Sequence, residues 1–428
     1  MTIARAAALL LVSLALPLSA ADPEKELEKA VKKSPPDVAA FVEACEALRA
    51  APSEKGVKAL VKFGPAIPNA DVYLAARDAL AAAKEGKALE ELLESAKKGK
   101  PEQRVLCLDA LAYHASDAAV EALAGALDAK EQPVRTTAIR GLARMKRKEG
   151  IPRLFGRFAK LDPKSTDAEV DELYKALKAL TGQQLETLDD WKKWWSTVEQ
   201  DFDPSKVGQV ADGGTRQRAT GKIFDSEVRS KKFVLCLDVS SSMRVIDLEP
   251  GKTWKDPKGQ ELPYEDPGVA WPPKEGSRFA RARSEFLAFI AQLDPSVNFT
   301  IVTFSDETKA WQEKLVPATE ANKKSASDFV SKMQWGPATR TDMALERCFA
   351  FAEADTIYFF SDGIPEKPKP TGGTEPIPQD EVLKLARTLN RVRKARLNTF
   401  GFATVSPQTR EFLRTLGAEN EGEYKDIR

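Results

Sequence analysis

The chain has 428 residues, too many for one ordinary hydrophobic core, so two or more domains are expected. Hydrophobic residues make up 42% of it and charged residues 30%, a composition typical of a globular protein. The 65 lysines and arginines nearly balance the 64 aspartates and glutamates, which argues against a general attraction to nucleic acid or to an anionic membrane.

The first 21 residues are typical of a secretory signal peptide. Arg5 supplies a positive charge, and the apolar stretch from Ala6 to Leu16 is shorter than the roughly 20 residues that span a bilayer. Small residues precede Asp22, where cleavage would occur. We therefore expect an exported, periplasmic or extracellular protein without an integral membrane segment in the mature chain. An uncleaved anchor is the alternative.

Residues 22–200 are predicted to form an all-helical array. Apolar pairs recur every 31 or 32 residues: Ala47-Leu48, Ala79-Leu80, Ala110-Leu111 and Gly141-Leu142. A second apolar series has the same spacing, so each unit contains two amphipathic helices that bury their apolar faces only by stacking. The pattern resembles HEAT repeats. Such an array either offers a concave protein-binding surface or braces the second half, and the sequence leaves both open.

The array closes with a tryptophan-rich helix and is followed by a linker. Trp191, Trp194 and Trp195 lie three and four residues apart, on one helix face. We expect this stripe to seal the last repeat; a ligand platform is the alternative. Residues 201–225 are polar, include Asp212-Gly213-Gly214, and are predicted to be a linker.

Strand and helix patterns alternate over residues 226–428. Strands are predicted at 232–238, 298–304, 310–316, 356–361, 396–403 and 422–427. Helices are predicted at 278–293, 319–333, 341–354, 379–394 and 407–417. This alternation predicts an α/β doubly wound, mainly parallel sheet covered on both faces. The basic residues late in this half are interpreted as a solvated helix face: Arg387, Arg391, Arg393, Lys394 and Arg396.

Oxygen-bearing side chains follow two of the predicted strands. Asp238, Ser240 and Ser242 come directly after one apolar run, and Asp362 closes another. Thr339 stands just before a predicted helix. Ligands of such sheets bind beyond the carboxyl ends of the strands. Hard oxygen ligands suit Mg²⁺ better than a soft metal, so the turn that carries Asp238, Ser240 and Ser242 favours a hard cation.

These motifs, in this order, resemble the metal-ion-dependent adhesion site of the von Willebrand factor A (vWA) domain, and the resemblance extends over about 225–428. It implies a Rossmann-like fold and a bound Mg²⁺, or Mn²⁺ or Ca²⁺. Ser240 and Ser242 would coordinate the ion directly, Thr339 when a ligand is bound, and Asp238 and Asp362 mainly through water. The tryptophan-rich tail resembles one found in exported planctomycete proteins with HEAT-like repeats, some of which also carry a vWA domain.

One departure from the vWA pattern is an insertion after the second serine. Arg244 to Ser277 precede the first helix and are too rich in Pro and Gly for regular structure. The aromatic residues Trp254, Tyr264 and Trp271 in this segment are candidates for a ligand surface. Long loops of this kind are often functional, and the alternative is packing or a mobile lid.

The sequence therefore predicts an exported, non-enzymatic binding protein that recognises an acidic group of a protein partner, with no role for nucleic acid. A metal-dependent hydrolase using the same ion is one alternative, and an adaptor subunit of an ATPase complex is another. His114 is the only histidine and lies in the helical half, so no Ser-His-Asp triad can form in the second half. We expect no catalytic residues.

Overall fold

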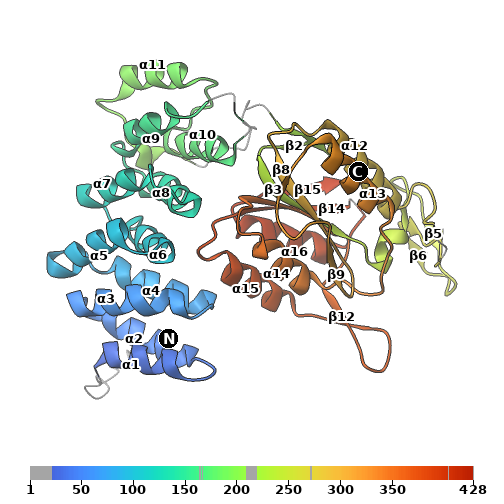
Figure 1. Cartoon of the computed structure of the whole chain (residues 1–428), viewed down its shortest axis with the longest axis horizontal. Helices are drawn as coiled ribbons and strands as arrows, with labels where there is room; N and C mark the ends of the chain where they lie inside the picture. Colours follow the sequence, from blue (N-terminus) through green and yellow to red (C-terminus); the bar gives the residue numbers. More distant parts are fainter. Residues whose placement is uncertain are drawn as a thin grey trace, which may run out of the picture.

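The computed structural model describes residues 22–162, 165, 167–208, 219–269, 272–402 and 404–427. The predicted signal peptide and the centre of the predicted linker, 209–218, lie outside these residues. The described part consists of a helical half and an α/β half that lie side by side (Figure 1). No helix within it is both long and apolar enough to cross a membrane.

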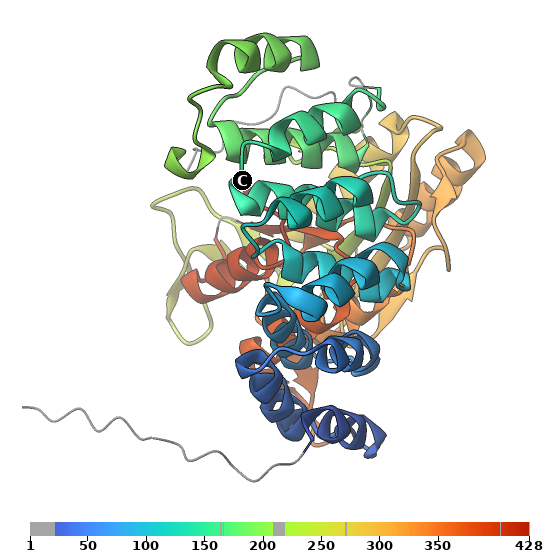
Figure 2. The same ribbon diagram turned by 90° about the vertical axis from the view of Figure 1, so that its left-hand side faces the viewer.

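The helical half is a two-layered stack. The helices α2, α4, α6, α8 and α10 contact one another in turn and form the layer nearer the α/β half, while α3, α5, α7 and α9 form the outer layer (Figures 1 and 2). The bounds are α1 (Pro23–Lys32), α2 (Val38–Ala50), α3 (Glu54–Phe63), α4 (Ala70–Ala81), α5 (Gly86–Lys98), α6 (Pro101–Leu111), α7 (Asp117–Ala126), α8 (Gln132–Met145), α9 (Gly150–Phe158), α10 (Ala168–Thr181) and α11 (Leu188–Val198), with short 3₁₀ helices at Gly64–Ala66 and Pro204–Lys206.

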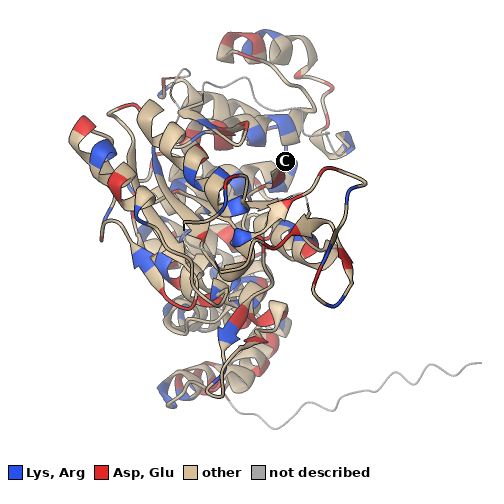
Figure 3. Ribbon diagram, turned by 90° about the vertical axis from the view of Figure 1, so that its right-hand side faces the viewer, with Lys and Arg blue, Asp and Glu red and all other residues tan. Residues whose placement is uncertain are grey.

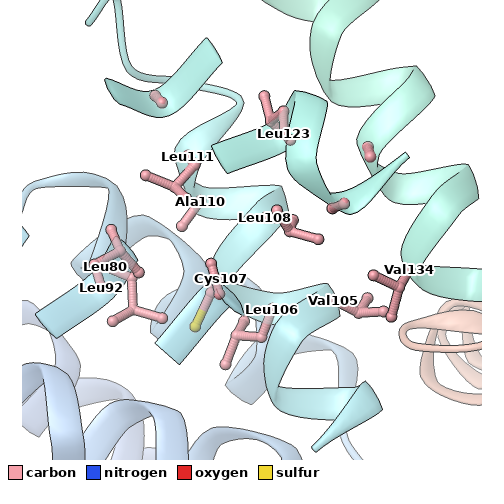
Figure 4. Close-up of a cluster of buried hydrophobic side chains, with 14 of the residues drawn as sticks. Leu80, Leu92, Val105, Leu106, Cys107, Leu108, Ala110, Leu111, Leu123 and Val134 are labelled. Carbon is pink, nitrogen blue, oxygen red and sulfur yellow. The ribbon is translucent and has the colours of Figure 1, made fainter. Parts of the chain in front are cut away.

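Helix α6 shows why the helices stack. Its residues Val105, Leu106, Cys107 and Leu108 are all buried, although they point in different directions around the helix (Figure 4). A helix that is apolar on several sides needs neighbours on several sides. Each side chain of this size contributes about 1.5–3 kcal/mol when it is fully buried, so the core exists only because successive helices share it.

The tryptophan-rich helix packs on the end of the stack. Trp191 is fully buried, Trp195 nearly so, and Trp194 packs against the same core. The rings of Trp194 and Trp195 also meet Phe202 edge to face, at centroid distances of 5.2 and 5.7 Å. These contacts favour the sealing role over a ligand platform.

The α/β half is built on one seven-stranded sheet with the order β10-β8-β3-β11-β14-β15, where β9 also pairs with β8. The five strands from β8 to β15 are parallel, and β9 and β10 are antiparallel. The strands are β3 (Lys232–Asp238), β8 (Asn298–Phe304), β9 (Thr308–Ala310), β10 (Val316–Pro317), β11 (Thr356–Phe360), β14 (Arg396–Phe402) and β15 (Tyr424–Ile427). The helices are α12 (Arg278–Gln292), α13 (Glu320–Ser331), α14 (Thr341–Ala350), α15 (Gln379–Asn390) and α16 (Pro407–Ala418).

Strand β3 separates two hydrophobic cores. Phe233 and Leu235 face the core that includes α12 and α13, while Val234 and Cys236 face the one under α14, α15 and α16. Both faces are covered, which explains why this strand is a continuous apolar run rather than an alternating one. The chain passes from β3 to β8 on one side and later to β11 on the other, so strand order reverses at β3.

The first hairpin of the α/β half begins earlier than the sequence indicates. β1 (Gly221–Ile223) pairs with β2 (Ser226–Val228), and the buried side chains of Ile223 and Val228 join the core under α12. The sequence predicts that residues 221–223 belong to the linker, 201–225, because that segment is polar overall. The structure instead uses one apolar residue of each short strand to close the core.

The two halves meet in a buried ion-pair network. The guanidinium of Arg396 lies between Asp171 and Glu172 of α10, with Nη2 2.6 Å from Glu172 Oε1. Arg140 on α8 also binds Glu172, at 2.8 Å. Burial alone would raise the pKa of both carboxyl groups, but the neighbouring positive charges outweigh it and lower both values. The interpretation of Arg396 as solvated is wrong, because α10 supplies its counter-charges.

Further contacts join the halves around α15. Val392 packs against the helical core, and Lys394 forms an ion pair of 2.5 Å with Asp109 on α6. Arg396 begins β14, so this interface lies at the amino ends of the parallel strands. Asp238 stands at the opposite, carboxyl end of β3. The helical half therefore supports the edge of the sheet remote from the predicted metal ligands.

Candidate metal centre

Asp238 connects the loops that follow the neighbouring strands β3 and β11 through hydrogen bonds. It is fully buried at the end of β3; its Oδ1 accepts a hydrogen bond from the backbone N–H of Ser240 at 2.8 Å. Its Oδ2 accepts one from the hydroxyl of Ser361, directly after β11, at 2.6 Å. The carboxylate is thus held by donors on both sides and fixes the β3 loop against the β11 loop.

The two predicted serine ligands face each other in the turn after β3, where Ser241–Arg244 form a 3₁₀ helix. The Oγ atoms of Ser240 and Ser242 are 3.1 Å apart, and Ser242 donates to Asp362 Oδ1 at 2.7 Å. Ser240 is the extended residue before this helix, and the turn that follows it brings its hydroxyl within reach of that of Ser242. Three oxygen atoms from two loops consequently lie in one hydrogen-bonded row.

Thr339 reaches the same row from a third segment. The backbone of Gly336 pairs with the β3 loop, its N–H donating to Val239 O at 2.9 Å, and this places the following threonine. A methyl group on Gly363 would lie 3.1 Å from Thr339 Oγ1 and 3.6 Å from Ser242 Oγ. Both hydroxyls therefore border the space that Gly363 leaves open. The structure brings all five predicted ligands together, and we call this cluster the oxygen site: Asp238, Ser240, Ser242, Thr339 and Asp362.

The sequence analysis missed a buried arginine beside the oxygen site. Arg278 Nη1 is 2.7 Å from Asp362 Oδ2, and the same guanidinium binds Asp247 at 2.8 Å and Thr404 Oγ1 at 2.5 Å. It occupies the first turn of α12, where the helix dipole disfavours a positive charge. Two arginines in that turn, Arg278 and Arg281, were the available sequence signal, because cations placed there need acidic partners.

The electrostatics of this region leave one carboxylate without a counter-charge. Among the described residues, the ion pairs of Asp238, Asp247 and Asp362 are those with Arg278 and Arg281, which both bind Asp247. Burial raises the pKa of Asp238 to about 7, the charge of Asp362 adds to the shift, and hydrogen bonds oppose it. For Arg278 burial lowers the pKa, but the two carboxylates outweigh it and the pKa is raised. A further positive charge would suit the site.

The donor set suits a hard cation. Within the described residues there is no group of three or more His, Cys, Asp and Glu side chains that could hold a metal. The oxygen site is of another kind, because three of its five donors are hydroxyls. Hydroxyl and carboxylate oxygens together match the preference of Mg²⁺, Mn²⁺ and Ca²⁺. The residues present therefore fit a divalent ion.

The insertion reaches the oxygen site and is more regular than its composition indicates. It forms two small antiparallel pairs, β4 (Ile246–Asp247) with β7 (Tyr264–Glu265) and β5 (Trp254–Lys255) with β6 (Glu261–Leu262). The backbone of two-residue strands tolerates the flanking Pro and Gly, which lie in the turns. The β5–β6 pair projects from the side of the α/β half remote from the helical half (Figure 1), whereas β4 lies against the start of α12. Lysine, arginine and acidic residues are interspersed over this face (Figure 3).

The aromatic candidates of the insertion have different positions. Trp254 and Tyr264 are half-buried, and the guanidinium of Arg278 lies 5.8 Å from the centroid of the Tyr264 ring. Trp271 lies outside the described residues. Val269 is 73% exposed. The insertion is thus connected to the oxygen site through Tyr264 and Asp247, and only part of its apolar surface faces solvent.

A second segment beside the oxygen site, after the insertion, follows β11. β12 (Glu366–Pro368) pairs with β13 (Thr374–Pro376), and the backbone N–H of Glu366 donates to Thr339 O at 2.9 Å. This bond holds the hairpin against the threonine of the oxygen site. The insertion and the hairpin together border the carboxyl edge of the sheet.

Comparison with known proteins agrees with this fold. The family model described as von Willebrand factor type A domain matches residues 233–364, which include the whole oxygen site. Two curated relatives are each 26% identical over 35% of this chain: the human von Willebrand factor A domain-containing protein 3B over 149 residues, and the inter-alpha-trypsin inhibitor heavy chain H1 of Mesocricetus auratus over 160. The matches cover only 10% and 16% of those relatives.

Solved structures with the same type of domain are also similar to part of the chain. The structure described as von Willebrand factor type A from Catenulispora acidiphila has 15% sequence identity and a TM-score of 0.32. The alignment covers 47% of this chain and 40% of that one.

Proposed function

We propose that the α/β half, a von Willebrand factor type A domain by its fold and its family match, binds an acidic group of a protein partner through a divalent ion at the oxygen site. The observation that carries this proposal is the row of oxygens from three separate segments. Ser240, Ser242 and Asp362 are linked at 3.1 and 2.7 Å, and Thr339 borders the same space.

The hydroxyls of Ser240, Ser242 and Thr339 would hold the ion, Mg²⁺ or alternatively Mn²⁺ or Ca²⁺. Asp238 and Asp362 would act through water, since the oxygens of both carboxylates already accept hydrogen bonds or ion pairs. A cation held mainly by neutral hydroxyls keeps much of its charge and supplies a position for a partner's carboxylate. Recognition of an aspartate or glutamate follows from that chemistry.

The same contacts favour binding over hydrolysis. A hydrolase would need a general base close to the ion, with a free oxygen or nitrogen to accept a proton. The carboxylates of Asp238 and Asp362 are already engaged. We therefore propose a non-enzymatic, exported protein, in which the helical half is a HEAT-like brace at the opposite edge of the sheet.

Capture of partners from the envelope fraction, with the tagged full chain as bait, tests this proposal. We expect a partner to be retained in Mg²⁺ and released by EDTA, and Thr339→Val to lose it because the hydroxyl is replaced by a methyl of equal size. Deleting Gly251–Pro273 should weaken partner capture more than Mn²⁺ affinity, because the oxygen site and Asp247 remain while Trp254 and Tyr264 are lost.

Two results would contradict the proposal. Equal retention of the partner in Mg²⁺ and in EDTA would show that no metal ion takes part in its recognition. Unchanged capture by the deletion variant, with an unchanged melting temperature, would show that the insertion takes no part in the ligand surface. Measuring the melting temperature alongside capture separates a lost contact from a lost fold.

A further inference from the structure

A cavity of about 190 Å³ lies between the helical half and the α/β half. Its walls come from α4, α6 and α8 on one side and from α15 and the segments that follow α15 and α16 on the other. Helix α15 contacts α4 at this point, and Figure 1 shows the two helices facing each other. The cavity shares no residue with the oxygen site and lies near the opposite edge of the sheet.

Positive side chains predominate in the lining. It contains Arg77, Arg140, Arg144, Arg387, Arg391 and Lys394. Four of these are neutralised by ion pairs within the fold: Arg77 with Asp78, Arg140 with Glu172, Arg387 with Glu419 and Lys394 with Asp109. Among the residues that the structure describes, Arg144 and Arg391 have no carboxylate partner. Glu421, also in the lining, offsets part of this positive charge, and two guanidinium groups of the described residues remain without an ion pair in one cavity.

Arg391 is the more constrained of the two. Its Nη1 donates to the carbonyl of Thr388 at 2.7 Å, but its Nε is buried and has no hydrogen-bond acceptor. Burial lowers the pKa of this guanidinium, and the opposing interaction with Tyr73 does not cancel the shift. Buried donors are normally satisfied, so an unpaired one in a cavity wall indicates a missing acceptor.

An aromatic side chain that is not itself part of the lining, Tyr113, lies beside two arginines that are. The guanidinium groups of Arg77 and Arg144 lie 5.0 and 5.4 Å from the centroid of the Tyr113 ring. Tyr113 is 48% exposed and Leu74, in the lining, is 38% exposed. Only one other large hydrophobic side chain in the described residues, Val269, is exposed. Tyrosine and arginine are the residues that most often carry binding energy at protein interfaces.

We propose that this cavity binds an acidic peptide segment of a partner protein. The carboxylates of the peptide contact Arg144 and Arg391, and an apolar side chain of the peptide packs on Leu74 and Tyr113. The planar guanidinium matches a carboxylate with two parallel hydrogen bonds. The exposed side chains of Leu74 and Tyr113 favour a peptide over a bare anion, because an anion has no apolar group to pack against them. The site acts without a metal ion and is independent of the proposed function.

Fluorescence anisotropy with the full chain and a labelled peptide, Glu-Glu-Leu-Glu-Glu, tests this inference in the presence of EDTA. We expect saturable binding that weakens with added salt, and no binding of the Gln-Gln-Leu-Gln-Gln peptide. Arg144→Gln combined with Arg391→Gln should weaken binding at least tenfold, because each removes a charge-assisted contact. Arg153→Gln removes an exposed charge from α9, in the outer layer, and should leave the affinity unchanged.

Arg144→Gln and Tyr113→Ala, tested singly, keep the inference falsifiable if Arg391→Gln disturbs the interface, because both residues are exposed and each change should still weaken binding several-fold. Equal affinity of the glutamine peptide, or equal affinity of the Arg144→Gln and Arg153→Gln variants, would overturn the inference. So would displacement of the peptide by an equal concentration of inorganic phosphate. Peptide binding that is unchanged in EDTA and in the Thr339→Val variant distinguishes this cavity from the oxygen site.

Discussion

Replacing Arg396 by glutamine should reduce the free energy of unfolding by about 3–5 kcal/mol, because it leaves Asp171 and Glu172 buried beside a neutral amide. Arg140 still binds Glu172, and Asp171 keeps contacts with Lys175 and Arg229 that include distances of 3.7 and 3.6 Å. Denaturant unfolding of the full chain measures the loss.

The matched control is Arg414→Gln, which breaks an exposed ion pair with Glu411 at 3.3 Å. Exposed pairs contribute about 0–1 kcal/mol, so this variant should unfold almost like the wild type. Equal stability of the two variants would contradict the buried network as the connection between the halves.

The same network predicts a dependence of stability on pH. The folded-state pKa values of Asp171 and Glu172 lie below their unfolded values of 3.8 and 4.5. Groups with lowered pKa values stabilise the fold fully at higher pH and lose that contribution as the pH falls below about 5. In Arg396→Gln the pKa values are less depressed, so the decrease of stability between pH 6 and pH 4 should be shallower than in the wild type.

Arg278→Gln should likewise lower the free energy of unfolding by about 3–5 kcal/mol in EDTA, since Asp362 and Asp247 lose a buried counter-charge. Saturating Mn²⁺ should restore part of this stability and raise the melting temperature of the variant more than that of the wild type. The reason is that a cation at the oxygen site and the Arg278 guanidinium compensate the same carboxylate, Asp362.

The control for this prediction is Arg283→Gln on the same helix, for which the structure gives no ion pair among the described residues, and it should respond to Mn²⁺ as the wild type does. If Mn²⁺ stabilises Arg278→Gln no more than the wild type, the ion and the guanidinium do not share Asp362. The role of Arg278 would then be limited to holding the insertion in place through Asp247.

The sequence predicts those parts of the fold that depend on local patterns. The expected strands 232–238 and 298–304 coincide with β3 and β8, because central strands are continuous apolar runs with polar ends. The expected strand 310–316 is instead divided into β9 and β10, two short edge strands. Edge strands bury little surface, so their limits are set by pairing rather than by hydrophobicity.

The missed features are contacts between residues far apart in sequence. The convergence of Ser240, Ser242 and Asp362 follows from the position of each at the carboxyl end of a strand, which local patterns do predict. Arg278 approaches Asp362 across 84 residues, and Arg396 approaches Asp171 across 225. Neither contact leaves a periodic signal; the place of Arg278 in the first turn of α12 hints at acidic partners without naming them, and nothing local distinguishes Arg396 from a solvated arginine.

The most direct test of the central claim, a divalent-ion site made largely of hydroxyls, is calorimetric titration of the full chain with Mn²⁺ and Mg²⁺. We predict one binding event in the wild type and in Thr197→Val, which removes a hydroxyl from the exposed surface of α11. Ser242→Ala and Thr339→Val should lose binding while keeping the wild-type melting temperature in EDTA within a few degrees. Equal Mn²⁺ affinity in all four proteins would contradict the claim.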